Sequence, residues 1–117
     1  MASDNSVDMD DLLERIDGDR TLLAELVEML RKDYRMQFQA ARVALSKNDS
    51  AGIQRIGHAL KGAMSNLAAP LASTMARDLE SCGRTGDLSS VGELLTQLEH
   101  EMGRVAAKLE SLCPELV

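Results

Sequence analysis

The hydrophobic residues of the chain recur every three or four positions in five successive stretches, a spacing that predicts amphipathic helices. Glycine and small polar residues cluster between these stretches at residues 17–19, 47–50 and 82–87, and Pro70 marks the remaining boundary. Asp19 is the expected N-cap of the second helix, and Asp49 or Ser50 is that of the third. Pro70 suits the first turn of the fourth helix, where a missing N–H breaks no helical hydrogen bond.

The last stretch carries a long and regular apolar stripe. Asp87 reopens the helical pattern, and Ser90 with Glu93 forms an S-x-x-E sequence typical of a capping box.

Helical spacing assigns core positions in four of the helices. They are Met9, Leu12, Leu13 and Ile16 in the first helix, Leu23, Leu26, Val27, Leu30, Tyr34, Phe38, Ala41 and Leu45 in the second, Leu71, Ala72, Met75, Leu79 and Cys82 in the fourth, and Leu88, Val91, Leu95, Leu98, Met102, Val105, Leu109 and Leu112 in the last.

Short turns between helices of this length make neighbouring helices antiparallel, which predicts an all-α fold. We expect an antiparallel up-and-down four-helix bundle with a short additional N-terminal helix. Residues 1–6 are polar and are expected to be disordered, so residues 7–117 would form a single bundle domain. Four amphipathic helices can cover one another's apolar faces, which favours a monomer. A coiled-coil homodimer through the last stripe is the alternative.

Charge and composition narrow the class of partner. The chain of 117 residues has a formal charge of −6 and a pI near 4.8, which disfavours nucleic acid or an anionic membrane as partner and leaves a protein. No stretch resembles a signal peptide or is apolar enough to span a bilayer, so a cytoplasmic location is expected. Cys82 and Cys113 lack a C-x-x-C spacing and are expected to be reduced, packed thiols.

The third helix divides into an apolar and a polar side around one histidine. The apolar side carries Ile53, Ile56, Gly57, Leu60, Ala63, Met64 and Leu67. The polar side carries Gln54, Arg55, His58, Lys61, Gly62 and Ser65. His58 is therefore expected to face water, with Lys61 and Gly62 on the turn beside its imidazole.

Gly62 is informative because a glycine inside a helix costs about 1 kcal/mol relative to alanine, and the buried face does not require it. A missing side chain one turn from His58 lets another protein approach closely. Lys61 offers a cation to an anion held on the same surface. The alternative is an ordinary solvent-facing helix with an incidental glycine.

The sequence His58-Ala59-Leu60-Lys61-Gly62, followed by Leu67-Ala68-Ala69, resembles the H-x-L-K-G…L-G-A signature of histidine-containing phosphotransfer (HPt) domains. Ala68 stands where the family usually has glycine, a difference at the end of the helix rather than at the histidine. The resemblance implies a phosphorelay intermediate in which His58 accepts and donates a phosphoryl group. The group would be exchanged with an aspartate of a response-regulator receiver domain, either free or within a hybrid histidine kinase.

The chemistry of imidazole fits this role, because an exposed neutral ring nitrogen is nucleophilic near neutral pH. The chain has neither a glycine-rich phosphate loop nor a carboxylate cluster for Mg²⁺. We therefore expect a phosphocarrier without an ATP site or cofactor of its own, and not an enzyme. The resemblance places the acidic pocket and the Mg²⁺ on the partner receiver domain. Metal binding through His58 alone would lack a sufficient ligand set.

The same resemblance gives roles to two residues of the fourth helix. Glu80, 22 residues after His58, matches a polar position that orients the ring by hydrogen bonding, and a carboxylate there would hold one tautomer. Arg84, 26 residues after the histidine, matches a basic position beside the phosphate. The full set of predicted docking residues is Gln54, Arg55, Gly62, Ser65, Arg77, Glu80 and Arg84. His100, which lacks a lysine on the turn beside it, is predicted to be inert.

Two alternative functions stay open. The chain could be the phosphotransfer domain of a chemotaxis-type kinase, which uses a similar motif and receives its phosphate from a linked ATP-binding domain. It could also be a non-catalytic helical adaptor whose histidine face binds a partner without chemistry. Transfer from a phosphorylated receiver domain would separate these functions.

Overall fold

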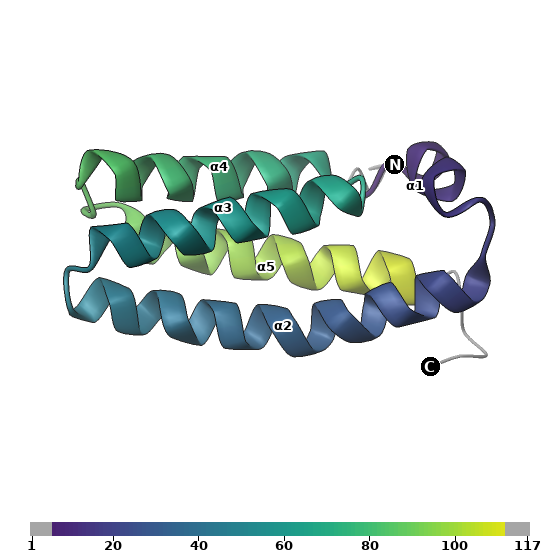
Figure 1. The fold of residues 1–117 in the computed structure, drawn as a ribbon, viewed down its shortest axis with the longest axis horizontal. Coiled ribbons are helices and arrows are strands. Elements are labelled where there is room, and N and C mark those ends of the chain that lie inside the picture. Colours follow the sequence, from purple (N-terminus) through teal and green to yellow (C-terminus); the bar gives the residue numbers. More distant parts are fainter. Residues whose placement is uncertain (1–5, 112–117) are drawn as a thin grey trace.

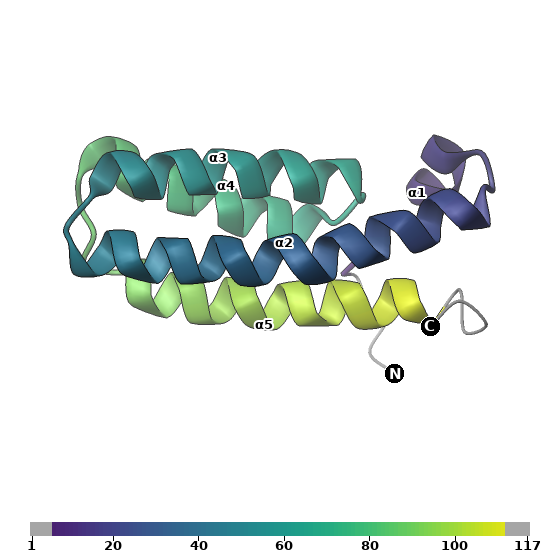
Figure 2. The ribbon, with the colours of Figure 1, turned by 60° about the horizontal axis from the view of Figure 1, so that its bottom comes forward.

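The computed structural model describes residues 6–111, which form five α-helices and no strand. The helices are α1 (Met9–Ile16), α2 (Arg20–Ser46), α3 (Ser50–Asn66), α4 (Pro70–Thr85) and α5 (Val91–Glu110). Helices α2 to α5 run alternately up and down beside one another, and α1 lies at the end of the bundle where α2 begins (Figures 1 and 2). The structure confirms the all-α bundle with a short additional N-terminal helix. No helix within residues 6–111 is both long and apolar enough to cross a membrane.

The helix N-termini follow the sequence signals in α2, α3 and α4. The Asp19 carboxylate accepts from the backbone N–H of Leu22 at 3.0 Å, and Asp49 caps α3 in the same way. Pro70 is the first residue of α4. The capping box predicted for α5 is wrong, because the side chain of Ser90 makes no cap hydrogen bond. Asp87 instead accepts from the backbone N–H and the hydroxyl of Ser89, which closes a turn before α5 begins.

The core is mainly aliphatic, and every helix contributes to it. The largest fully buried side chains are Phe38, Leu12, Ile53, Met64, Leu79, Leu95, Leu98, Met102, Leu109, Val91 and Val105. Of the two aromatic residues predicted to lie in the core, only Phe38 is buried. Tyr34 is half-buried and meets Phe38 edge-on, with ring centroids 6.0 Å apart.

Three residues predicted to be buried are exposed: Leu13, Ala63 and Leu71. Each of the three is next in sequence to a buried residue, and successive residues of a helix are rotated by about 100° around its axis. The helical spacing therefore located the buried face correctly but not the position of its edge.

At the N-terminus, Ser6 was predicted to be disordered but is buried. Residues 1–5 and 112–117, which include Leu112 and Cys113, lie outside the described part of the chain.

Helices α3 and α4 approach each other closely because a glycine from each faces the other's backbone. A Cβ on Gly57 would come within 2.7 Å of the Cα of Glu80, and one on Gly83 within 2.6 Å of the Cα of Gln54. Any side chain at either position would push the helices apart. Gly83 was predicted to belong to the turn that ends α4. It lies inside that helix, which continues to Thr85 and ends at Gly86, whose φ is 82°.

The turn after α3 requires a left-handed residue, and Ala68 occupies that position with a φ of 54°. Glycine adopts this conformation without a steric penalty, whereas an alanine there is strained by about 1–2 kcal/mol. The departure from the family signature noted at this residue therefore affects backbone strain at the end of α3. The turn is tied to the N-terminal segment by the backbone N–H of Asp8, which donates to the carbonyl of Ala68 at 2.7 Å.

Candidate functional site

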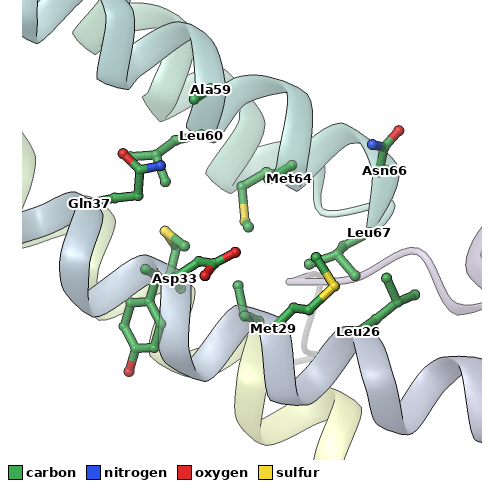
Figure 3. A pocket seen from close by; sticks show the side chains of 13 residues that line it. Leu26, Met29, Asp33, Gln37, Ala59, Leu60, Met64, Asn66 and Leu67 are labelled. Carbon is green, nitrogen blue, oxygen red and sulfur yellow. The ribbon is translucent and has the colours of Figure 1, made fainter.

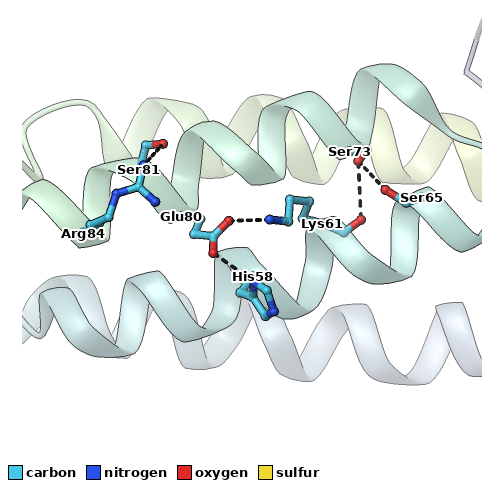
Figure 4. Close-up of polar contacts among 7 residues, drawn as sticks. All are labelled: His58, Lys61, Ser65, Ser73, Glu80, Ser81 and Arg84. Carbon is cyan, nitrogen blue, oxygen red and sulfur yellow. Dashed lines mark hydrogen bonds and ion pairs between the residues drawn. The ribbon is translucent and has the colours of Figure 1, made fainter.

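His58 lies in the middle of α3 and points away from the core, as predicted. Its side chain is 69% exposed, whereas that of Glu80 on α4 is only 13% exposed. The Nδ1 atom of His58 lies 2.9 Å from Oε2 of Glu80, so the side of the imidazole ring that carries Nδ1 is held against α4 (Figure 4). The ring is accessible to a partner while its orientation is fixed.

Glu80 also contacts Lys61 through its second carboxylate oxygen. Oε1 of Glu80 lies 2.9 Å from Nζ of Lys61, so one carboxylate joins the histidine and the lysine (Figure 4). The hydrogen bond from Lys61 is the main cause of a lowered pKa at Glu80; partial burial opposes it, and His58 adds to the lowering. Glu80 is therefore an ionised acceptor at neutral pH.

The charge on Glu80 determines which nitrogen of the ring carries a proton. An ionised carboxylate can only accept a hydrogen bond, so Nδ1 of a neutral His58 must be the donor. The lone pair of that tautomer is then on Nε2, the nitrogen on the far side of the ring from Nδ1. The arrangement leaves a nucleophilic nitrogen available to a partner.

The close packing of α3 and α4 brings these side chains together. Gly57, the residue before His58, lies against the backbone of Glu80 itself. One turn along α3, Lys61 reaches the same carboxylate. The sequence analysis predicted Glu80 from the family spacing, and the structure brings it to His58. The sequence analysis did not predict that Glu80 would also pair with Lys61.

The surface next to His58 is open at Gly62. No atom lies within 4 Å of the place where a Cβ of Gly62 would stand. This absence of packing supports the argument that the glycine is not required by the fold. Arg55 is exposed on the same helix, and Gln54 is half-buried.

A pair of serines continues this surface toward the end of α3. Ser65 Oγ lies 2.8 Å from Ser73 Oγ on α4, and the Ser73 hydroxyl also donates to the carbonyl of Lys61 at 3.4 Å (Figure 4). Ser73 was not among the residues predicted for the site. Nothing in the helical spacing distinguishes it from other outward-facing serines, because its contacts depend on the register of α3 against α4.

Two basic residues predicted for this site are not brought to the histidine. Arg84 donates to the hydroxyl of Ser81 on its own helix at 3.1 Å, and Figure 4 shows its side chain beyond Glu80. Arg77 is exposed on α4. Within residues 6–111, the side chains that contact one another at the site are therefore His58, Glu80 and Lys61. In the same range, no group of three or more His, Cys, Asp or Glu side chains is arranged to hold a metal ion.

An apolar hollow of about 290 Å³ lies between α2 and α3, beside the histidine face (Figure 3). Ala59, the residue after His58, lines it together with Ala63, Met29 and Leu26. Asp33 contributes a carboxylate to its lining. The exposure of Ala63 is explained by this hollow, because the residue faces it rather than the core.

Comparison with known proteins identifies the fold and the family. The sequence model of the Hpt domain matches residues 25–112. The structure is similar to that of histidine-containing phosphotransfer protein B (HptB) from Pseudomonas aeruginosa PAO1, with a TM-score of 0.84 and 23% identity over 91% of this chain and 92% of that one. It is also similar to the HPT domain of an Hpt sensor hybrid histidine kinase from Shewanella, with a TM-score of 0.76 and 18% identity over 97% of both chains.

No curated protein sequence matches the chain significantly. The family match covers most of the chain, including α3 and α4 with His58, Lys61 and Glu80. The chain therefore belongs to the Hpt domain family of phosphotransfer domains.

Proposed function

We propose that the protein is a phosphorelay intermediate in which His58 exchanges a phosphoryl group with an aspartate of a response-regulator receiver domain. Membership of the Hpt family gives it a phosphotransfer role in two-component signalling. The observation that carries the finer proposal is the contact between His58 Nδ1 and the ionised Glu80, which leaves Nε2 exposed as the nucleophile.

In the proposed step, Nε2 of His58 attacks the phosphorus of an aspartyl phosphate on the receiver domain. The N–P bond forms while the bond from phosphorus to the aspartate oxygen breaks, and the aspartate leaves as a carboxylate. The ring becomes positively charged because Nδ1 keeps its proton. Glu80, which accepts that proton's hydrogen bond, stabilises the charge. The reverse reaction passes the group to a second receiver.

Lys61 supplies a cation one turn from the reacting nitrogen. Its ammonium group pairs with Glu80 in the unphosphorylated protein. A phosphoryl group on Nε2 adds negative charge within the same small cluster, and Lys61 is positioned to offset it. Phosphoryl transfer depends mainly on positioning and charge neutralisation, so this contribution is expected to affect the rate.

The remaining requirements fall to the partner. We infer that the receiver domain supplies the acidic pocket and the Mg²⁺, and that this chain is a phosphocarrier without an ATP site. The receiver could stand alone or belong to a hybrid histidine kinase, and we place the exchange in the cytoplasm. Gly62 leaves room for the receiver to approach His58, with Arg55, Gln54 and Ser65 on the same helix and Arg77 on α4 as the predicted docking surface.

The proposal is tested by mixing the protein with receiver domains that carry a radiolabelled aspartyl phosphate. We expect label to move to this chain and to be labile in acid but stable in base, as a phosphohistidine is. Label that passes only from an ATP-binding kinase domain would favour the chemotaxis-type alternative. No labelling from either donor would leave the adaptor function and contradict the proposal.

A further inference from the structure

Asp33 differs in charge from every other residue that lines the hollow between α2 and α3. The rest of the lining is apolar or neutral. The Asp33 carboxylate points into the hollow from α2, and Met64 faces it from α3 (Figure 3). Within residues 6–111 the Asp33 side chain makes no hydrogen bond or ion pair. It is exposed, so water solvates the charge as long as the hollow stays uncovered.

The hollow borders the surface that a receiver domain must cover to reach His58. Ala59 follows His58 in sequence and lines the hollow, and Ala63 lines it about 6 Å further along α3. One partner in a complex of standard size covers about 800 Å², the area of a circle with a radius of about 16 Å. Centred on His58, such a footprint includes the hollow. The α3 residues on this side, Ala59, Gly62 and Ala63, carry at most a methyl group and leave the way open.

A partner that covers the hollow changes the surroundings of the Asp33 charge. Burying an unpaired carboxylate under an apolar surface removes its water and is strongly unfavourable. A lysine or arginine of the partner, placed beside the carboxylate, offsets this penalty and forms a charge-assisted hydrogen bond. One residue thus favours partners with a base at this point and disfavours those without one, which is how specificity arises between similar proteins.

The apolar part of the hollow fits a large apolar side chain of the partner. Met29 is 56% exposed at its edge, and Met64 and Met102 lie deeper in its lining. Methionine side chains are flexible and adapt to partners of different shape. A relay intermediate exchanges its phosphoryl group with more than one receiver, and an adaptable apolar contact suits this. Asp33 adds the charge that the adaptable part cannot supply.

We propose that Asp33 selects the receiver domains with which this chain exchanges phosphoryl groups. The selected receivers place an apolar side chain in the hollow and a lysine or arginine beside Asp33. This inference rests on the proposed function, because it names the chemistry of the partner surface next to His58. Asp33 does not contact His58, Lys61 or Glu80, so its effect falls on the dissociation constant of the complex.

Methyl NMR of the methionines, in the full chain titrated with unphosphorylated receiver domains of the same organism, tests where a receiver binds. Met29, Met64 and Met102 line the hollow, whereas Met9 in α1 and Met75 in α4 do not. We expect the first three signals to shift with a receiver that also passes label to His58. Transfer without these shifts would overturn the inference and leave the proposed function standing. Shifts without transfer from any phosphorylated receiver would contradict the proposed function alone, and the absence of both would contradict both.

The charge is tested by Asp33→Lys, with Glu93→Lys on α5 as the control that changes the net charge equally at an exposed carboxylate. Asp33→Lys should weaken receiver binding by about tenfold or more, because two cations would meet. Asp33→Asn, which neither attracts nor repels a cation, should lie between it and the parent, and Glu93→Lys should bind like the parent. Both Asp33 variants should keep the parent's melting temperature, since the side chain is exposed.

Two results would overturn the proposal. The first is an equal dissociation constant for the parent and Asp33→Lys. The second is a shift of the hollow methionine signals when the chain alone is concentrated, because a second copy would then occupy the hollow.

Discussion

Gly57 packs so closely against the backbone of Glu80 that a Cβ at position 57 would come within 2.7 Å of the Cα of Glu80. The two helices therefore meet one residue before the histidine. This contact sets the distance at which the Glu80 carboxylate reaches His58 Nδ1. Gly57, on the buried face of α3, thus helps to position His58, the candidate phosphoacceptor.

The first prediction is that replacing glycines of the bundle by alanine has opposite effects on stability, depending on the position. Gly57→Ala and Gly83→Ala should each destabilise the fold by about 1–3 kcal/mol, because the added methyl would meet helix backbone. Gly62→Ala should stabilise it by about 0.5–1 kcal/mol, since the position is exposed, helical and free of neighbours. Urea unfolding of the three variants checks this. A destabilised Gly62→Ala would mean that Gly62 serves the fold and not a partner.

Gly62 also separates docking from chemistry. Gly62→Gln should fold normally, but its side chain would stand one turn from His58 on the surface that a receiver must approach. Transfer from a phosphorylated receiver should fall sharply with glutamine and much less with alanine. Labelling by a small donor such as phosphoramidate, if the parent accepts it, should be kept in both variants. If Gly62→Gln accepted the phosphoryl group from the receiver as fast as the parent, the docking role of Gly62 would be contradicted.

Glu80 should control the rate of transfer through the ring. Glu80→Ala removes the hydrogen bond to Nδ1 and should slow transfer by about tenfold or more. Glu80→Gln keeps an acceptor but loses the charge, so its rate should lie between those of alanine and the parent. Nitrogen NMR of His58 should show the Nδ1–H tautomer in the parent and a mixture in Glu80→Ala. Glu93→Gln, at an exposed carboxylate of α5, is the matched control. Equal rates in all variants would remove Glu80 from the mechanism.

The lowered pKa of Glu80 has a consequence for stability in acid. A carboxylate whose pKa is lower in the folded than in the unfolded state contributes stability above the unfolded value of about 4.3. That contribution is lost as the pH falls through the folded pKa, which lies below this value. The difference in free energy of unfolding between the parent and Glu80→Gln should therefore shrink below about pH 4.3. Urea unfolding across pH measures it, and a difference that persists in strong acid would be contrary to this account.

Local sequence signals were enough to predict most of the fold. The caps at Asp19 and Asp49 and the start at Pro70 depend on neighbouring residues alone. Helical spacing located the buried faces but misplaced Leu13, Ala63 and Leu71 at their edges. The edge of a face depends on how closely the next helix approaches, which is a property of the assembled bundle.

The site was predicted less completely, for the same reason. The contact between His58 and Glu80 was expected from the family spacing and agrees with the structure, whereas that between Lys61 and Glu80 depends on the exact register of α3 against α4. The role of Gly83 could not be found from sequence, because a glycine near Gly86 is equally typical of a helix end. The structure also shows a buried carboxylate, Glu101, that no apolar pattern would predict.

The central claim is that His58 is the phosphoacceptor, and the most direct measurement maps the phosphorylated residue after incubation with a phosphorylated receiver domain. The parent and His100→Gln should carry an acid-labile phosphoryl group on His58. His58→Gln should carry none and keep the parent's melting temperature, because the side chain is exposed. Acid-labile phosphate that still appears on the His58→Gln variant would contradict the account.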